Sequence, residues 1–153
     1  MLGMRAALLG RAANVPAPPP SYGPELVVNG TFASDIAGWD AGGGPISWVA
    51  GKLRRPSPGD GNYAQQLIAG LTPGALYNFR GNMAPSELDR ARIRLLVGAS
   101  EILCYADVGG SVDISFTPSG SGVYIVLEAA SLSAWASAGE YADFDNLSLR
   151  ERL

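Results

Sequence analysis

The chain lacks histidine altogether and has a single cysteine among its 153 residues. Without an imidazole, Ser-His and Cys-His nucleophile pairs and the usual zinc sites cannot form, which excludes the Ser-His-Asp class of hydrolase. Cys104 cannot form an internal disulfide. Because it lies in the apolar, strand-like run Glu-Ile-Leu-Cys-Tyr, we expect a buried thiol rather than a reactive one.

Charged residues are also scarce, at 16% of the chain, and the formal net charge is −3. The acids are dispersed, so the charge supports solubility without specifying an electrostatic partner. We expect no nucleic-acid partner and no membrane span.

Glycine and proline, by contrast, are abundant, with 20 and 11 residues. Such frequent turn formers predict short strands and many turns rather than helices. About nine or ten short alternating runs separated by turn signals are typical of a sandwich. We therefore predict an all-β fold, a jelly-roll β-sandwich of antiparallel strands, over residues 25–153.

The stretch from Asn62 to Met83 has the clearest strand pattern. Two β-type runs, Tyr63–Ala69 and Ala75–Met83, flank a segment in which Pro73 fixes φ and Gly74 accepts a positive φ. This pattern predicts a strand, a tight turn and a strand, which we interpret as the central β-hairpin of the domain.

The first residues of the chain differ from the rest. Residues 1–22 carry two arginines and no acid, giving +2, whereas the remainder carries nine bases and fourteen acids, giving −5. The apolar core Ala6–Leu9 is about four residues long against the roughly seven to fifteen of a signal peptide, so we expect no cleavage. Pro16–Pro20 then favours an extended, polyproline-like segment. We predict an anchoring arm over residues 1–24, whose partner-binding residues are Arg5, Leu8, Leu9, Arg11, Pro18 and Tyr22.

Three arginines, Arg90, Arg92 and Arg94, alternate along one predicted strand. Like charges at period two mark either a solvated strand face or a contact with an acidic partner surface, and the sequence leaves both open.

Four motifs, taken in order over roughly residues 25–150, resemble those of carbohydrate-binding modules with the galactose-binding-like jelly roll, especially families 4, 9 and 22. They are Leu26–Phe32, Gly38-Trp39, Gln66-Leu67 through Tyr77, and Phe144–Leu149. Similar domains also occur in phage virion proteins, where a short N-terminal arm attaches the module to the capsid or tail. No single motif is specific, but their order supports the fold.

The resemblance implies a structural calcium ion between the first and last strands. Asp145 matches the closing Asp of the family and Glu25 is a further oxygen donor, but Ala33 stands where many members have an acid. Calcium needs about six to eight oxygen ligands. The alternative is that Asp145 bonds only to nearby backbone.

The resemblance also implies glycan binding by aromatic rings on one sheet or in the loops at one end. A ring packs against the C–H face of a sugar, while amides orient its hydroxyls. Each such residue could instead belong to the core, as we expect of Phe32 and Trp39, and Trp135 could pack on a neighbouring subunit. The candidates are Trp48, Tyr63, Tyr105, Tyr124 and Trp135, with Gln65, Gln66 and Asn78 as polar partners.

Three functions fit these features. We predict a non-catalytic virion protein of the head-decoration or fibre type. Its arm would bind capsid or tail subunits, its copies would form a homo-oligomer, and its domain would display a module for host-surface polysaccharide. The alternative is a secreted or enzyme-associated glycan-binding module, located outside the cell.

The third function is a glycosidase. Asp143 and Asp145 are about 7 Å apart by strand rise, which falls within the roughly 6.5–9.5 Å of inverting enzymes. They lie on the closing strand motif rather than at a predicted cleft, so we expect no enzyme.

Overall fold

The computed structural model describes residues 18–56, 63–86, 89–106, 108–131 and 139–153. In this part of the chain the secondary structure consists of strands without any helix. The ten strands are β1 (Asp40–Gly42), β2 (Ser47–Val49), β3 (Lys52–Pro56), β4 (Tyr63–Ala69), β5 (Tyr77–Pro85), β6 (Asp89–Val97), β7 (Ser100–Ala106), β8 (Gly110–Phe116), β9 (Gly122–Ser131) and β10 (Tyr141–Glu151).

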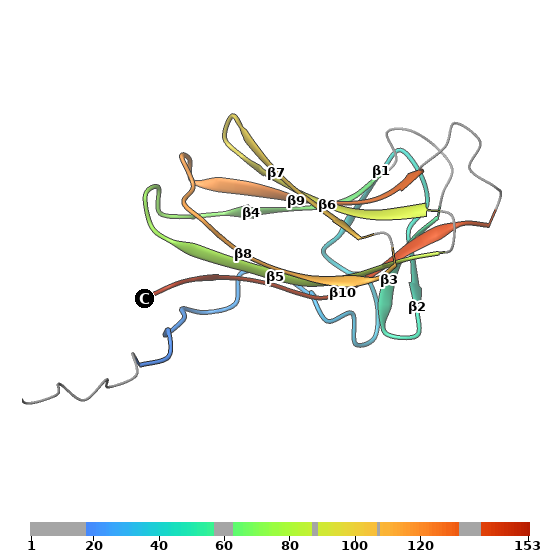
Figure 1. The fold of residues 1–153 in the computed structure, drawn as a ribbon, viewed down its shortest axis with the longest axis horizontal. Helices are drawn as coiled ribbons and strands as arrows, with labels where there is room; N and C mark the ends of the chain where they lie inside the picture. The colour runs from blue at the N-terminus through green and yellow to red at the C-terminus, as the bar shows by residue number, and fades with distance from the viewer. Residues whose placement is uncertain (1–17, 57–62, 87–88, 107, 132–138) are drawn as a thin grey trace, which may run out of the picture.

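The strands form two five-stranded antiparallel sheets that face each other (Figure 1). One sheet has the order β1-β4-β9-β6-β7 and is called the β9 sheet; the other has the order β2-β3-β10-β5-β8 and is called the β10 sheet. This arrangement confirms the predicted all-β jelly-roll sandwich.

The core lies between the two sheets and follows from the alternation of side chains along each strand. Phe79 and Phe144 from the β10 sheet and Ile93 and Ile125 from the β9 sheet are fully buried. Burying each such side chain contributes about 1.5–3 kcal/mol. The inner face of each described strand is therefore committed to the core, which leaves the outer faces of these strands open to a ligand.

Three of the residues assigned to the interior from the sequence are indeed buried. Phe32 and Trp39 pack against each other with ring centroids 5.7 Å apart. Cys104 points into the sandwich, and burial raises the pKa of its thiol. The interpretation of Cys104 as a buried thiol is confirmed.

The predicted hairpin at Asn62–Met83 is wrong, although both strands exist. β4 belongs to the β9 sheet and β5 to the β10 sheet. The link between them crosses from one sheet to the other and bonds to the loop before β9, with Leu71 N donating to Ser121 O and Gly74 N to Pro118 O. By crossing, β4 and β5 cover opposite sides of one core, which two strands paired side by side could not do.

The opening of the domain lies along the end of β10. Backbone hydrogen bonds join Gly23 N to Glu151 O at 2.9 Å and Leu26 N to Leu149 O at 3.0 Å, and Tyr22 forms a bridge with Arg152. The segment Glu25–Val28 is thus held by β10 without being a strand itself. The described part of the predicted arm leaves the sandwich beside the C-terminus (Figure 1).

The predicted arm is only partly described. Pro18 is exposed and Tyr22 is half-buried. The other arm residues named from the sequence, Arg5, Leu8, Leu9 and Arg11, lie outside the described residues. Within the described ranges no helix is long and apolar enough to cross a membrane.

Candidate functional site

The outer face of the β9 sheet gathers exposed apolar side chains from adjoining strands. Leu67 of β4 lies opposite Tyr124 of β9, which lies opposite Leu96 of β6. Leu67 is 51% exposed and Tyr124 is 40% exposed, whereas their chain neighbours Ile68 and Ile125 are buried. The register therefore builds an apolar row across three strands.

The next row on this face combines polar and apolar groups. Gln65 of β4, Val126 of β9, Arg94 of β6 and Leu103 of β7 are register partners in turn. Leu103 is 47% exposed, so the apolar surface continues to the edge strand β7.

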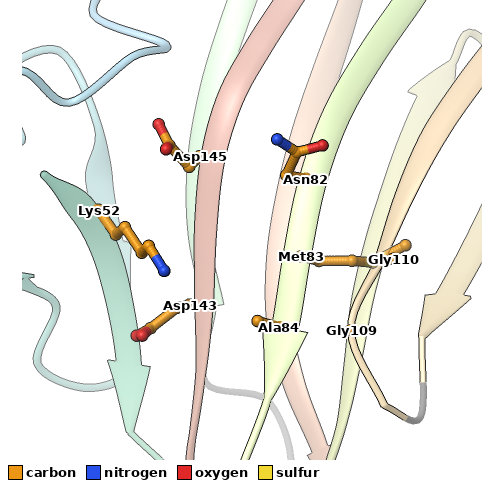
Figure 2. A pocket seen from close by; sticks show the side chains of 8 residues that line it. All are labelled: Lys52, Asn82, Met83, Ala84, Gly109, Gly110, Asp143 and Asp145. Carbon is orange, nitrogen blue, oxygen red and sulfur yellow. The ribbon is translucent and has the colours of Figure 1, made fainter.

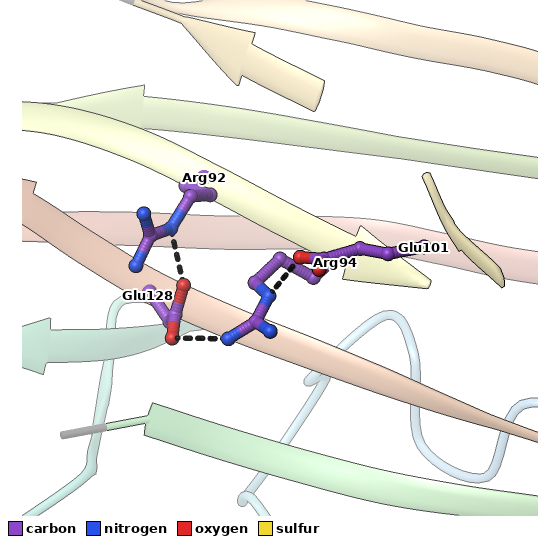
Figure 3. A network of polar contacts seen from close by, with 4 residues as sticks. All are labelled: Arg92, Arg94, Glu101 and Glu128. Atoms are coloured by element: carbon purple, nitrogen blue, oxygen red, sulfur yellow. Dashed lines mark hydrogen bonds and ion pairs between the residues drawn. The ribbon is translucent and has the colours of Figure 1, made fainter. Parts of the chain in front are cut away.

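Arg92, Arg94, Glu101 and Glu128 form a network on the same face (Figure 3). Arg92 Nε donates to Glu128 Oε2, and Arg94 donates to Glu101 through Nε and to Glu128 Oε1 through Nη1 at 3.3 Å. The Glu128 side chain is only 6% exposed, so its charge requires these partners. The hydrogen bond to Glu101 raises the pKa of Arg94 above its ordinary value.

This network bears on the alternating arginines of β6. The acidic partners of Arg92 and Arg94 come from the chain itself. Both guanidinium groups are fixed by Glu128, and yet the two arginine side chains remain about 30% exposed. The face thus offers an apolar row beside oriented hydrogen-bond donors, which suits a flat ligand with one apolar side and polar edges.

The residues predicted to bind glycan do not lie together. Tyr63 is on β4 and Tyr105 on β7, opposite Arg92, both in the β9 sheet. Trp48 is exposed on β2 of the other sheet, and its Nε1 donates to Phe32 O at 2.7 Å. Trp135 lies outside the described residues.

The local sequence explains how Tyr63 is placed. Its register partner is Gly42 of β1, and a Cβ on Gly42 would lie 2.2 Å from the Tyr63 ring. Only glycine leaves room for the ring to lie over the β1 backbone. The half-buried position of Tyr63 thus depends on Gly42 at the end of β1.

Gln66 is buried, and its amide is already occupied by backbone. Oε1 accepts from Val28 N at 2.8 Å, while Nε2 donates to Val28 O at 3.0 Å and to Gly38 O at 2.9 Å. Gln66 therefore holds the opening loop against β4. Leu67, Leu103 and Glu128 were not predicted from the sequence as site residues; strand alternation was the available signal, but it does not show which strands adjoin.

The two residues expected to hold calcium are engaged elsewhere. Glu25 accepts hydrogen bonds from Leu149 N at 2.8 Å, Ser148 Oγ at 2.6 Å and Arg150 Nε at 3.0 Å, besides two from its own segment. Partial burial works to raise the pKa of Glu25, but these hydrogen bonds together outweigh it and the pKa is lowered.

Asp145 bonds instead to its neighbour Asn146, with Oδ1 accepting from the backbone N at 2.7 Å. This contact agrees with the alternative to calcium binding, in which Asp145 bonds to nearby backbone. In the described ranges no three Asp, Glu, His or Cys residues cluster, and Oε2 of Glu25 is already engaged by the positively charged Arg150. The donor set at Glu25 and Asp145 does not fit a calcium ion.

Asp143, the other acid of the considered glycosidase pair, has a fixed partner. Asp143 accepts hydrogen bonds from Arg54 Nε at 2.7 Å and from Arg54 Nη2 at 2.8 Å. These hydrogen bonds raise the pKa of Arg54. Both carboxylate oxygens of Asp143 are therefore engaged by one guanidinium group.

No protein-family model matches the sequence, and no curated protein matches it. Solved structures do resemble the fold. A family 4 carbohydrate-binding module superposes with a TM-score of 0.62 at 14% identity, covering 81% of this chain and 98% of that chain. The N-terminal cellulose-binding domain of Cellulomonas fimi β-1,4-glucanase C gives 0.59 at 18% identity, covering 82% and 96%.

The fold is that of a carbohydrate-binding module. The enzymatically active domain of bacteriophage CBA120 tailspike protein 4 also contains this fold, with a TM-score of 0.59 and 15% identity over 83% of this chain and 21% of that chain. At such identities the likeness establishes the carbohydrate-binding-module fold. What the chain binds has to be argued from its own surface.

Proposed function

We propose that this protein is a non-catalytic glycan-binding module whose site is the outer face of the β9 sheet. The observation that carries the proposal is the apolar row Leu67-Tyr124-Leu96 beside the fixed guanidinium groups of Arg92 and Arg94. Sugar rings have apolar C–H faces and hydroxyl edges, and this surface offers a partner for each.

The charges on this face favour a neutral glycan. Arg92 and Arg94 are balanced by Glu128 and Glu101 within one network. Because the pairs cancel, an acidic sugar gains little net attraction, while the N–H groups remain oriented for hydroxyl oxygens. The cellulose-binding domain with the same fold supports a polysaccharide as the ligand class.

We further propose that the module is displayed on a virion. In this proposal residues 1–24 bind capsid or tail subunits, and copies of the chain assemble as a homo-oligomer. The support is the tailspike domain of the same fold and the course of residues 18–20 away from the sandwich, beyond the contacts of residues 21–23 with the C-terminal residues. The alternative, an extracellular module that accompanies an enzyme, uses the same glycan site and differs in what the arm binds.

Binding of cellulose, xylan and galactan oligosaccharides, measured by calorimetry, tests the glycan site. Replacing Tyr124 by alanine removes an exposed ring from the centre of the apolar row, and we expect affinity to fall about tenfold, which corresponds to roughly 1.4 kcal/mol. Tyr22→Ala is the matched control, because Tyr22 lies at the β10 sheet. It should bind as the wild type does.

Two results would contradict the assignment. One is the absence of binding to any of these neutral glycans by the wild type. The other is loss of binding in Tyr22→Ala with full binding in Tyr124→Ala, which would move the site to the opposite sheet. Tyr105 and Trp135 stay predictions for the same site until their variants are measured.

A further inference from the structure

A hollow of about 310 Å³ lies on the outer face of the β10 sheet, away from the proposed glycan face (Figure 2). It spans β3, β10, β5 and the start of β8. Its volume is near the lower end of the roughly 300–1,000 Å³ of ligand sites, which suits one small ligand. The lining residues are Lys52, Asn82, Met83, Ala84, Gly109, Gly110, Asp143 and Asp145.

Small residues create the depression. Ala84 of β5 and Gly109 and Gly110 at the start of β8 present no more than a methyl group, while longer polar side chains rise from β3, β10 and β5 around them (Figure 2). The floor is therefore backbone and methyl groups, and the rim is polar. An apolar floor with a few polar groups at its edge is the usual composition of a small-ligand site.

The rim has hydrogen-bonding capacity that the protein does not use. Within the described part of the chain, the ammonium of Lys52 and the amide of Asn82 make no side-chain hydrogen bond or ion pair. Among the described residues, Asp145 accepts only from Asn146, through one bond to each oxygen. On the β9 sheet, by contrast, the charged side chains of the network are paired with one another, Arg92 and Arg94 with Glu128 and Glu101.

One wall of the hollow is rigid. Asp143 is held in its bidentate pair with Arg54, and the Arg54 guanidinium lies 3.5 Å from the centroid of the Tyr141 ring. These contacts fix the side chains of Asp143, Arg54 and Tyr141 in the free protein. Less side-chain conformational entropy is therefore lost when a ligand binds.

The charges around the hollow select the class of ligand. Lys52 is offset by Asp145, and Arg54 by Asp143, so neither an anion nor a cation is favoured overall. What remains is a close set of donors and acceptors. A hydroxyl group both donates and accepts, so neighbouring hydroxyls match this set better than a phosphate, which would face two carboxylates.

We propose that this hollow, the β10 site, binds one neutral sugar residue through adjacent hydroxyls, with Asp145 accepting and Lys52 and Asn82 donating. A second hollow of about 370 Å³ shares Asn82 and continues along β5 past Arg80 and Asn146, so a longer saccharide has a polar path. With sites on opposite sheets, one molecule bridges two glycan chains.

Amide chemical shifts of the full ¹⁵N-labelled chain test the β10 site directly. The probes are methyl glycosides of glucose, xylose and galactose, with inorganic phosphate and calcium chloride as separate arms. We expect one glycoside to shift the Asn82 side-chain amide and the Ala84 and Gly110 backbone amides in a saturable way. Asn82→Ala should weaken that binding at least about tenfold, and Lys52→Ala should do the same if Asn82→Ala disturbs the fold.

Tyr124→Ala, on the opposite sheet, is the matched control and should leave the β10 titration unchanged. The proposal is overturned if no glycoside shifts these amides, if phosphate or calcium binds there instead, or if both rim variants bind as the wild type does. Glycan binding at the β9 face is measured separately, with the Tyr124→Ala variant. A negative result for the β10 site is therefore distinguished from a negative result for the β9 face.

Discussion

Glu25 shows how one carboxylate joins the two ends of the domain. It is an opening-segment residue whose oxygens accept from Ser148, Leu149 and Arg150 of the last strand. The resemblance to carbohydrate-binding modules led us to expect a calcium ion between the same segments. In this structure Arg150 supplies a positive charge beside Glu25. The two segments are joined by hydrogen bonds that Ser148, Leu149 and Arg150 donate to the Glu25 carboxylate.

Glu25→Gln tests this closure through its pH dependence. Because hydrogen bonds lower the pKa of Glu25, the carboxylate stabilises the fold above its unfolded pKa of about 4.5, and this contribution is lost as pH falls through the folded pKa. We expect the variant to lose about 1 kcal/mol of unfolding free energy at pH 7, since the pair is half in solvent. Below the folded pKa the two proteins should be nearly equal. Urea denaturation at pH 7 and at low pH measures the difference.

Asp40→Asn is the control for Glu25→Gln, because the Asp40 side chain bonds to no other described residue. It should follow the wild-type stability at each pH. An equal loss for Glu25→Gln at both pH values would show that the charge of Glu25 is irrelevant. A rise in the melting temperature of the wild type with added calcium would place a metal in this closure after all.

At the scale of the elements, the opening segment and β10 are fitted to each other closely. Leu147 N donates to Gly30 O at 2.9 Å, and a Cβ on Gly30 would lie only 2.0 Å from Leu147 O. The obstacle is backbone, which cannot move aside as a flexible side chain would. Gly30 is therefore the residue that lets the Asn29-Gly30 turn lie against the last strand.

Gly30→Ala should separate these two segments and lower the unfolding free energy by about 1–3 kcal/mol, the range typical of overpacking. Thermal denaturation followed by circular dichroism measures the loss. Gly120→Ala is the matched control, since a Cβ there meets nothing within 4 Å, and it should be near neutral. Equal melting temperatures for the two variants would contradict the close fit.

The strands themselves could be predicted from the sequence, because alternation is a local property. Tyr63–Ala69 was predicted with the bounds of β4, and the arginine run and the closing motif fall within β6 and β10. Pairing could not be predicted in the same way. The sequence of the turn between β4 and β5 is the same whether the two strands pair or belong to different sheets. The turn is held in the crossing arrangement by hydrogen bonds to Ser121 and Pro118, which are far from it in the sequence.

The candidate site was only partly predictable for a related reason. Aromatic residue type pointed to Tyr63 and Tyr124, which do lie in the β9 sheet. Leu67 could not be found, because it stands in an apolar run and is exposed only by its position on the outer face. The prediction of Gln66 as a polar partner did not foresee that its amide reaches Val28 and Gly38.

At the scale of the whole molecule, the described part of the arm and the proposed glycan face lie at different sheets. Residues 21–26 bond to the end of β10, whereas the apolar row and the arginine network lie on the β9 sheet. The β10 site lies near Asp143 and Asp145, about 20 Å along β10 from Glu151, where the arm joins. In the proposed arrangement, a particle that binds the arm lies nearest the C-terminal end of β10 and leaves the apolar row of the β9 sheet uncovered.

Deleting residues 1–20 tests the anchoring role without disturbing the sandwich. The cut lies before the contacts of Ser21, Tyr22 and Gly23 with the C-terminal residues, so we expect the melting temperature and glycan affinity to stay unchanged. Retention on phage particles, measured by co-sedimentation, should be lost. Deleting residues 1–22 instead removes the Tyr22 bridge and should also lower the melting temperature. If the shorter deletion is retained fully on particles, the arm is no anchor, and the extracellular module becomes the better account of a domain that still binds glycan.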